Sequence, residues 1–356
     1  MADRLYLDHA ATTPMLDAAR VAVADGMARW ANPSSPHAEG RAARAALERA
    51  RAEIAAAYGW RGETLLTSGA SESLAIALTR STRARLLIGA TEHDAAIRAA
   101  PDATIIPVTP DGLIDQTALA ERLATPALVA VQWANSETGV RQPIAALAAI
   151  VHAAGGLLLV DAAQMPAGAD PALAETADFI AISAHKRGAP PGTGALLVRD
   201  LATLTPVGGQ ERGYRAGTEN LPGALGHAAA LAVAEPVSHY AGLREKLDDA
   251  IARSGGEVVG AGASRHPAIG SYRMRGLAAA TQLVRFDMAG IAVSAGSACS
   301  SGSMKPSHVL TAMGWSGEAT REVIRVSFGR ATTEADIDRF VAAWRSIARS
   351  VQAFAA

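Results

Sequence analysis

Short apolar runs alternate with helix-like segments from about residue 50 to residue 240, and this alternation restricts the fold more than any other feature. The candidate strands are ETLLTSG, ARLLIGATEH, ATIIPVTP, ALVAVQWANSE, GLLLVDAAQ, DFIAISAHK and GALLVRD. Segments with helical character lie between several of them, including SESLAIALTR, QTALAERLA and PIAALAAIVHAAG. Strands that are apolar throughout and alternate with helices are typical of a mostly parallel sheet. We therefore expect an α/β fold.

The pattern changes near Pro236, where a second unit begins. The segment SHYAGLREKLDDAIARSG predicts an amphipathic helix capped by Ser238, and TTEADIDRFVAAWRSIARS predicts a helix near the C-terminus. A chain of 356 residues is long for a single core. We expect one large domain followed by a smaller α+β unit.

Composition and charge narrow the possible partners. The chain is 49% hydrophobic and 19% charged, with a net charge of −1, so we expect a well-packed globule that binds neither nucleic acid nor membranes. Cys299 is the one cysteine, which rules out an internal disulfide and suits a reducing compartment. The N-terminal stretch MADRLYLDHAATTP has no apolar signal core. We expect a cytoplasmic protein.

Polar residues follow five of the candidate strands. In an open parallel sheet, ligands bind beyond the carboxyl ends of the strands. The residues at these ends are Ala70–Ser71–Glu72, Thr91–Glu92–His93, Asn135, Asp161 to Gln164, and Ala184–His185–Lys186. Five such ends on one rim predict a binding site.

Three of these groups suggest one cofactor. SGASES opens a helix, where free N–H groups can hold a phosphate, although Ser71 can equally be an ordinary N-cap. Lys186 follows a buried strand, and a desolvated lysine can form a Schiff base. Asp161 ends a buried strand and needs a cationic or hydrogen-bonding partner, such as a pyridinium N–H. Together these groups match what pyridoxal phosphate (PLP) requires of a protein.

Ten motifs carry a family resemblance that runs nearly end to end. They are YLDHAATTP, NPSSPHAEGR, TSGASES, TEH, NSETGVRQP, VDAAQ, SAHK, GGQERGYRAGTEN, GSACSSGSMKPSHVL and IRVSFGR. In these motifs the chain resembles a cysteine desulfurase of the class-V aminotransferase-like, fold-type-I PLP family, in the branch with a longer, mobile cysteine loop. The resemblance implies a large PLP-binding domain with a mostly parallel seven-stranded sheet over residues 14–236. It also implies a small domain, residues 1–13 and 237–356, that carries the cysteine loop.

The resemblance implies a set of cofactor-binding residues. They are Ala70, Ser71, His93, Asn135, Asp161, Gln164, Ser183, His185, Lys186 and Thr218. In this set Lys186 binds the cofactor covalently, Asp161 pairs with its pyridine nitrogen, and His93 stacks on its ring. Gln164 and Asn135 lie near the phenolic oxygen. The phosphate is held by Ala70, Ser71, Ser183 and His185, with Thr218 reaching the phosphate of the partner subunit in a homodimer.

The resemblance also implies a reaction. L-cysteine becomes L-alanine, and Cys299 receives the sulfur as a persulfide that passes to a sulfur acceptor or an iron–sulfur scaffold protein. Lys186, His93 and Cys299 would be catalytic, because Lys186 moves the Cα proton and the Cys299 thiolate is the nucleophile. Arg325 would hold the substrate carboxylate through a bidentate pair, although a structural salt bridge is the plainer interpretation. Asn32 would line the substrate pocket.

Several alternatives stay open. A selenocysteine lyase or an aminotransferase would use the same cofactor, although an aminotransferase needs no thiol such as Cys299. A non-catalytic structural relative is disfavoured by the presence of Lys186, Asp161 and Arg325 together with that thiol. A metal site is not expected, because the candidate ligands Asp8, His9 and His37 lack a tight spacing.

The chain departs from the family pattern at residues near two of its motifs, and PVGGQERG has fewer glycines than the usual run. Leu74 stands where an asparagine is common after the phosphate turn, and Trp133 precedes Asn135. Trp133 would either crowd the cofactor face or pack in the core.

Overall fold

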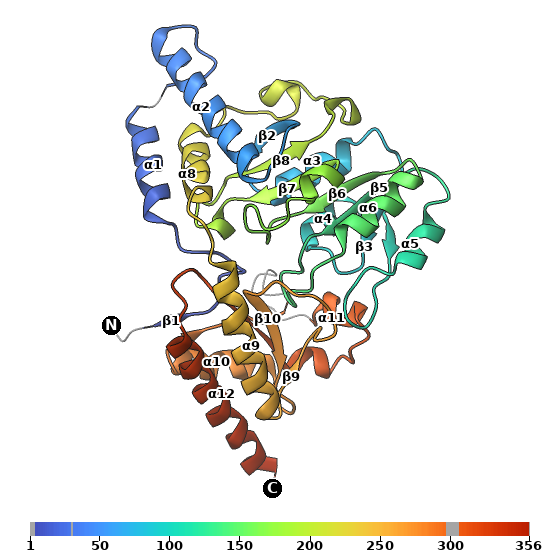
Figure 1. Cartoon of the computed structure of the whole chain (residues 1–356), viewed down its shortest axis with the longest axis vertical. Coiled ribbons are helices and arrows are strands. Elements are labelled where there is room, and N and C mark those ends of the chain that lie inside the picture. The colour runs from blue at the N-terminus through green and yellow to red at the C-terminus, as the bar shows by residue number, and fades with distance from the viewer. Residues whose placement is uncertain (1–3, 30, 297–305, 356) are drawn as a thin grey trace.

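The largest sheet contains the seven predicted strands. The computed structural model describes residues 4–29, 31–296 and 306–355, with no side-chain description beyond residue 350. The strands are β2 (Glu63–Thr67), β3 (Leu86–Gly89), β4 (Thr104–Ile106), β5 (Leu128–Gln132), β6 (Leu157–Asp161), β7 (Phe179–Ser183) and β8 (Gly194–Val198). Their order is β2-β8-β7-β6-β5-β3-β4, with β8 antiparallel to both neighbours and the pairs from β4 to β7 parallel (Figure 1). The predicted mostly parallel α/β sheet is confirmed.

Helices cover both faces of this sheet. They are α1 (Asp17–Ala28), α2 (Ala38–Ala57), α3 (Ala70–Arg80), α4 (Asp94–Ala99), α5 (Gln116–Arg122), α6 (Ile144–Ala153), α7 (Leu173–Thr176) and α8 (Leu221–Leu231). Successive strand side chains point to opposite faces. Accordingly, Val129 and Val131 of β5 pack in one core with α2, α6 and α8, and Leu128 and Ala130 pack in another with α3 and α4. Burial on both faces explains why the strands are apolar throughout.

A second unit forms the lower part of Figure 1. Its elements are β9 (Glu257–Val258), β10 (Ile269–Arg273), β11 (Ile291–Ala292), β12 (Val323–Ser327), α9 (Val237–Arg253), α10 (Ala279–Met288), α11 (His308–Ala312) and α12 (Glu334–Ala355). The three strands β12-β10-β9 form an antiparallel sheet, and β1 (Leu5–Tyr6) pairs with β11. Leu5 and Leu7 belong to the core of this unit. We propose domain boundaries at residues 13/14 and 236/237 on this basis.

Two helix starts differ from the expected caps. Helix α9 begins at Val237 after Pro236, with no side-chain cap, so Ser238 lies inside its first turn and the predicted cap is wrong. Pro236 itself is the N-cap residue, because its carbonyl accepts the first hydrogen bond of the helix from Tyr240 N–H (3.1 Å). Helix α3 begins after Gly69, whose φ is +148°, so Ser71 is not its N-cap. Glycine tolerates this backbone region, whereas other residues rarely adopt it.

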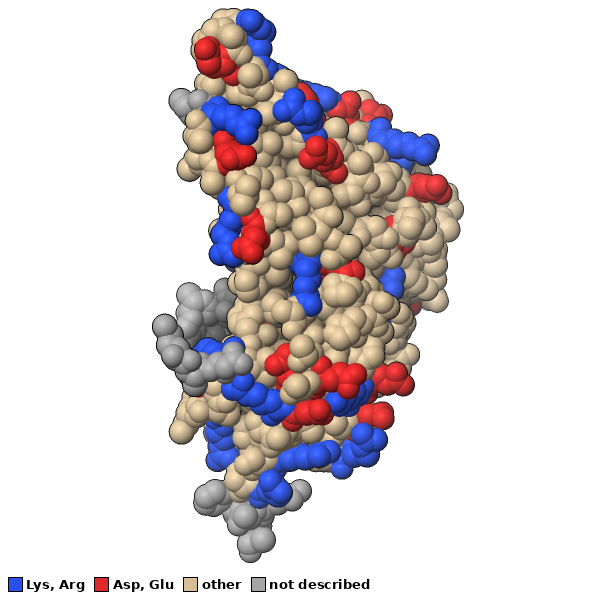
Figure 2. Space-filling view, turned by 60° about the vertical axis from the view of Figure 1, so that its left-hand side comes forward, with Lys and Arg blue, Asp and Glu red and all other residues tan. Residues whose placement is uncertain are grey.

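Charges of both signs are intermingled on the face shown in Figure 2. This view agrees with the net charge of −1. Over the part of the chain that the structure describes, no helix combines the length and the apolar character needed to cross a bilayer.

Candidate active site

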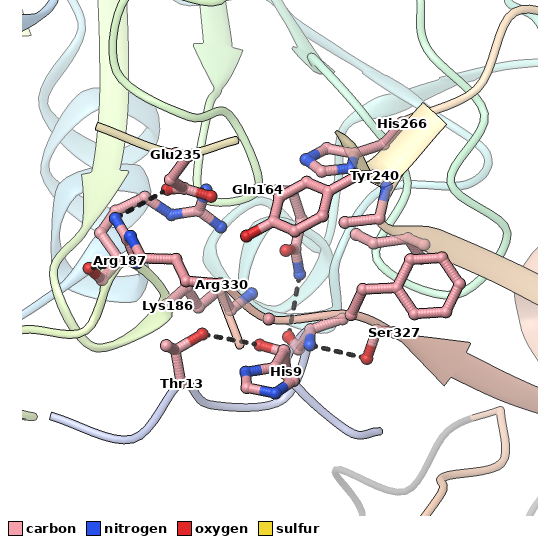
Figure 3. Close-up of a pocket in the computed structure, with 15 residues that line it drawn as sticks. His9, Thr13, Gln164, Lys186, Arg187, Glu235, Tyr240, His266, Ser327 and Arg330 are labelled. Atoms are coloured by element: carbon pink, nitrogen blue, oxygen red, sulfur yellow. Dashed lines mark hydrogen bonds and ion pairs between the residues drawn. The ribbon is translucent and has the colours of Figure 1, made fainter. Parts of the chain in front are cut away.

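Lys186 projects from a tight turn at the carboxyl end of β7. The turn is a 3-10 helix, η1 (His185–Arg187), and it ends at Gly188, whose φ of +82° favours glycine. The N-terminal segment fastens the turn, because Thr13 N–H donates to the His185 carbonyl (3.1 Å) and Leu16 N–H donates to the Gly188 carbonyl (2.9 Å). Lys186 is half-buried and lines a polar cavity between the two units (Figure 3). The turn therefore holds its amine at the rim.

His93 lies within electrostatic reach of both Asp161 and Lys186. Asp161 is buried at the end of β6, and its Oδ1 accepts a hydrogen bond from Ala163 N–H (2.9 Å). The pKa of His93 is lowered, chiefly by burial; Asp161 opposes this shift and Lys186 adds to it. Nδ1 of His93 accepts from Ala95 N–H (3.1 Å), which fixes the ring at the start of α4. The structure thus brings together the lysine, the aspartate and the ring that were predicted from sequence.

The start of α3 has the backbone geometry that an anion cradle requires. The first turn of a helix leaves backbone N–H groups without intrahelical partners, here at Ala70 and Ser71. Strand β8 packs directly against this turn, because a Cβ on Gly194 would lie 2.6 Å from the Gly69 Cα. Ser183 is buried at the end of β7, which pairs with β8 at Gly194.

His185 is held by the N-terminal segment. Its Nδ1 lies 3.1 Å from the Thr12 hydroxyl. Burial, aided by the neighbouring Lys186 and Arg187, lowers the pKa of His185 to about 4. The ring is therefore neutral near pH 7. If Nδ1 accepts the Thr12 hydroxyl proton, Nε2 carries the hydrogen and can donate to a phosphate oxygen.

Gln164 and Asn135 differ in how many hydrogen bonds their side chains already make. Nε2 of Gln164 donates to the Ala10 carbonyl (3.0 Å), and its Oε1 is buried without a hydrogen-bond partner among the described residues. Asn135 closes a turn: its Oδ1 accepts from Glu137 N–H (2.9 Å) and Thr138 N–H (2.8 Å). Nδ2 of Asn135 already donates to the Thr91 carbonyl (3.1 Å) and to Gln132 (3.2 Å). A bond from Asn135 to a ligand would have to share these donors.

These groups fit PLP. A buried carboxylate suits a pyridine N–H, helix N–H groups with a buried serine suit a phosphate, and the half-buried lysine suits an aldehyde. The buried Gln164 Oε1 is a polar atom that the described residues leave unsatisfied. A bound ligand would remove that cost.

Arg325 lies at the junction of the two units. Its Nη2 donates to Asp8 Oδ1 (2.6 Å) and its Nη1 donates to the Ser136 carbonyl (3.0 Å). The Nε is buried without a partner in the described structure. The structural salt bridge weighed from sequence is present, and a donor is still left for a substrate carboxylate.

Three predicted residues lie apart from this group or outside the described residues. Asn32 is exposed in the α1–α2 connection, where its Oδ1 accepts from Ser34 N–H (2.9 Å). Thr218 is exposed beside Gly217. The structure does not bring Asn32 or Thr218 into contact with Lys186, and their site roles stay predictions. Cys299 lies outside the described residues.

Trp133 and Leu74 are core residues. The Trp133 indole N–H donates to Asp170 (2.8 Å), Arg141 stacks 4.5 Å from the ring centroid, and His266 packs edge-on. Leu74 is buried with α4 and the sheet. Of the two interpretations of Trp133, the structure supports packing.

Sequence reasoning gave no role to Asp8 beyond a weak metal hypothesis, or to Glu92. Asp8 pairs with Arg325, and His37 caps α2 by accepting from Gly40 N–H. Both carboxylate oxygens of Glu92 are buried without partners among the described residues. Burial and the nearby Asp161 raise the pKa of Glu92 well above its ordinary value. The sequence feature that could have indicated a role for Glu92 is its position in the motif TEH.

Comparison with known proteins places this site in a family. The family model described as aminotransferase class-V matches residues 5–340. A cysteine desulfurase of Cereibacter sphaeroides is 36% identical to this chain. The alignment has 367 positions and covers 95% of this chain and 94% of the relative. The X-ray structure of a NifS-like protein from Rickettsia africae is 31% identical, with a TM-score of 0.89 and coverage of 97% and 99%. The structure of SspA in complex with cysteine is 26% identical, with a TM-score of 0.80 and coverage of 92% and 100%.

Fold and site together define a PLP-dependent enzyme of fold type I. The chain belongs to the aminotransferase class-V family. The family and the cofactor predicted from the motifs are therefore confirmed.

Proposed function

We propose that this enzyme is a cysteine desulfurase that converts L-cysteine to L-alanine and collects the sulfur on Cys299. The observation that carries the proposal is that His93 lies in the field of both Lys186 and Asp161 at the rim. Arg325 donates to Ser136, next to Asn135, and keeps an unused donor. Relatives across nearly the whole chain are cysteine desulfurases. SspA, a structural neighbour, was captured with cysteine.

Different residues would bind the cofactor, transfer the substrate's proton and hold the substrate. When bound, PLP supplies an electron sink that stabilises negative charge on the substrate carbon. Asp161 would hold the pyridine nitrogen, and Lys186 would anchor the cofactor and then carry the substrate's Cα proton. Neutral His93 would lie against the ring. The Nε and Nη2 edge of Arg325 would hold the substrate carboxylate.

Cys299 would take the sulfur atom. Its thiolate attacks the substrate sulfur, so an S–S bond forms while the substrate's C–S bond breaks. The bonding electrons return to the substrate, and a proton completes alanine. The thiol must remain reduced between turnovers, which suits the cytoplasm. The persulfide would then pass to an acceptor protein, such as an iron–sulfur scaffold.

The predicted homodimer remains part of this proposal. Thr218 and Asn32 are both exposed. They lie on one side of the molecule, since Ser34 near Asn32 contacts Gln210 (3.4 Å) in the loop that leads to Thr218. A second chain on this side could receive Thr218 at its own phosphate site.

Cys299→Ser tests the proposal. The variant should keep the visible absorbance of bound PLP, because no group that we assign to PLP binding in this chain has changed. With L-cysteine it should gain no sulfur by intact-protein mass spectrometry and release less than one hundredth of the wild-type alanine. Ser300→Ala is the matched control and should behave as wild type. Normal alanine and sulfide release by Cys299→Ser would refute the assigned role.

A further inference from the structure

Two arginines and one glutamate meet in the cavity that Lys186 lines (Figure 3). Arg187 directly follows Lys186 in the η1 turn, Glu235 precedes the first residues of α9, and Arg330 follows β12. The cluster therefore joins the lysine turn of the large unit to the segment that leads into α9 and to the segment that follows β12 in the second unit. None of these three residues was assigned a role above.

One carboxylate serves both guanidinium groups. Glu235 Oε1 lies 2.8 Å from Arg187 Nη1 and 3.5 Å from Arg330 Nη2. Their side chains are only 6% (Arg187), 12% (Glu235) and 17% (Arg330) exposed. Arg330 Nη1 also donates to the Arg187 carbonyl (3.4 Å), so Arg330 is hydrogen-bonded to the backbone of the residue next to Lys186. The buried cluster keeps one net positive charge, which water screens poorly.

The charge of Arg187 acts on two histidines that line the cavity, His9 and His266. Burial is the main cause that lowers the pKa of His9 to about 4 and that of His266 to about 3, and Arg187 contributes to both shifts. Glu235 acts in the opposite direction on His9. Lys186 lines the same cavity, so it lies in the field of the same pair.

Several charged or titratable groups lie near Lys186 in the part of the chain that the structure describes. They are His185 and Arg187 on its own turn, Asp161 and His93 at the rim, and His9, Glu235, Tyr240, His266 and Arg330 around the cavity. The pKa values of His9, His185 and His266 are about 4 or below, so these three histidines are neutral near pH 7. Arg187, Arg330 and Glu235 are then charged groups that line the cavity with Lys186.

We propose that Glu235 is a positioning residue: it holds Arg187 and Arg330 beside Lys186, offsets part of their charge, and so sets the pH at which the Lys186 nitrogen loses its proton. A lysine that carries a proton from the substrate must release it readily. Nearby positive charge favours that release, and Glu235 limits how far the effect goes. This inference rests on Lys186 as the attachment point of PLP.

The test is a pH titration of the visible absorbance of the resting holoenzyme, without L-cysteine. In Glu235→Gln the cluster carries one more positive charge, and the midpoint should fall by about one pH unit. In Arg187→Met it carries one fewer, and the midpoint should rise by about the same amount. Arg187→Met with Glu235→Gln restores the net charge, so the double variant should titrate near the wild-type midpoint. Glu175→Gln, an exposed carboxylate in α7, is the control and should leave the midpoint unchanged.

Opposite shifts that cancel in the double variant would support the proposal, because a purely structural role would not produce them. An unchanged midpoint in Arg187→Met overturns it even if Glu235→Gln fails to fold, since Arg187→Met keeps the pair between Glu235 and Arg330. Shifts of the same sign in both single variants would also overturn it. Two other results would contradict the proposed function and not this inference. They are a Lys186→Ala variant that keeps the pH-dependent visible absorbance, and a Cys299→Ser variant that stays fully active.

Discussion

Arg325 is held by two acceptors from distant parts of the chain. Asp8 takes one hydrogen of Nη2 (2.6 Å), and the Ser136 carbonyl takes one of Nη1 (3.0 Å). The guanidinium is nearly buried, so its charge depends on Asp8 for compensation. Asp8 therefore both orients the arginine and weakens its attraction for a second carboxylate.

Asp8→Asn separates these two effects. The amide oxygen still accepts from Arg325, but the negative charge is gone, so the guanidinium should attract a ligand carboxylate more strongly. We expect L-alanine, the product, to bind about tenfold more tightly. Titration of the cofactor's absorbance with L-alanine measures this. Weaker binding would show that orientation by the charged pair outweighs competition, and an unchanged affinity in Arg325→Lys would remove Arg325 from the site.

At the scale of elements, the turn between β5 and α6 connects the rim to the second unit. Ser307 at the start of α11 donates to the Glu137 carboxylate (2.6 Å), and Ser271 of β10 donates to the Glu137 carbonyl (2.7 Å). Asn135 closes the same turn, and Ser136 contacts Arg325. A single turn thus fixes Arg325 relative to the strands of the large sheet.

The approach of β8 to the start of α3 gives a second element-scale prediction. A Cβ on Gly194 would lie 2.5 Å from the Ile182 carbonyl oxygen and 2.6 Å from the Gly69 Cα. Both are backbone atoms, which cannot move easily. Gly194→Ala should push the first turn of α3 away and weaken PLP binding at least tenfold, measured by fluorescence titration of the apoprotein. Gly242→Ala, in an open position of α9, is the control and should stabilise the protein by about 0.5–1 kcal/mol. Equal PLP affinity in wild type and Gly194→Ala would exclude this cradle.

For the whole molecule, buried histidines make stability depend on pH. His227 in α8 is completely buried, neither ring nitrogen has a partner among the described residues, and burial lowers its pKa from 6.5 to about 4. Above pH 6.5 the ring is neutral in both the folded and the unfolded chain. As the pH falls from 6.5 towards 4, the unfolded chain binds a proton that the folded chain does not, and stability is lost.

His227→Leu should reduce this loss. A shift of about 2.5 pKa units corresponds to about 3 kcal/mol at pH 4. Urea midpoints measured at pH 7 and at pH 4.5 should therefore lie closer together in the variant than in the wild type. Its midpoint at pH 7 should be equal or higher, because an apolar side chain replaces two unsatisfied nitrogens. Parallel pH dependence in the two proteins would contradict the prediction.

The seven strands, five of the helices, the family and the cofactor could be predicted from sequence because each depends on local information. Apolar runs such as LLLV need burial on both faces wherever they lie, and SAHK or TSGASES carries its chemistry within a few residues. The matching family and the observed sheet confirm these predictions. The expected cap at Ser238 was wrong because Pro236 already supplies the helix start.

Partners between distant side chains could be found only after the chain had folded. Asp8 and Arg325 are 317 positions apart, and Arg187 and Glu235 are 48 positions apart. No local pattern states which buried charge will face which, because the pairing depends on the surfaces that come together. Burial then makes pairing obligatory, since an isolated charge inside a protein is strongly unfavourable.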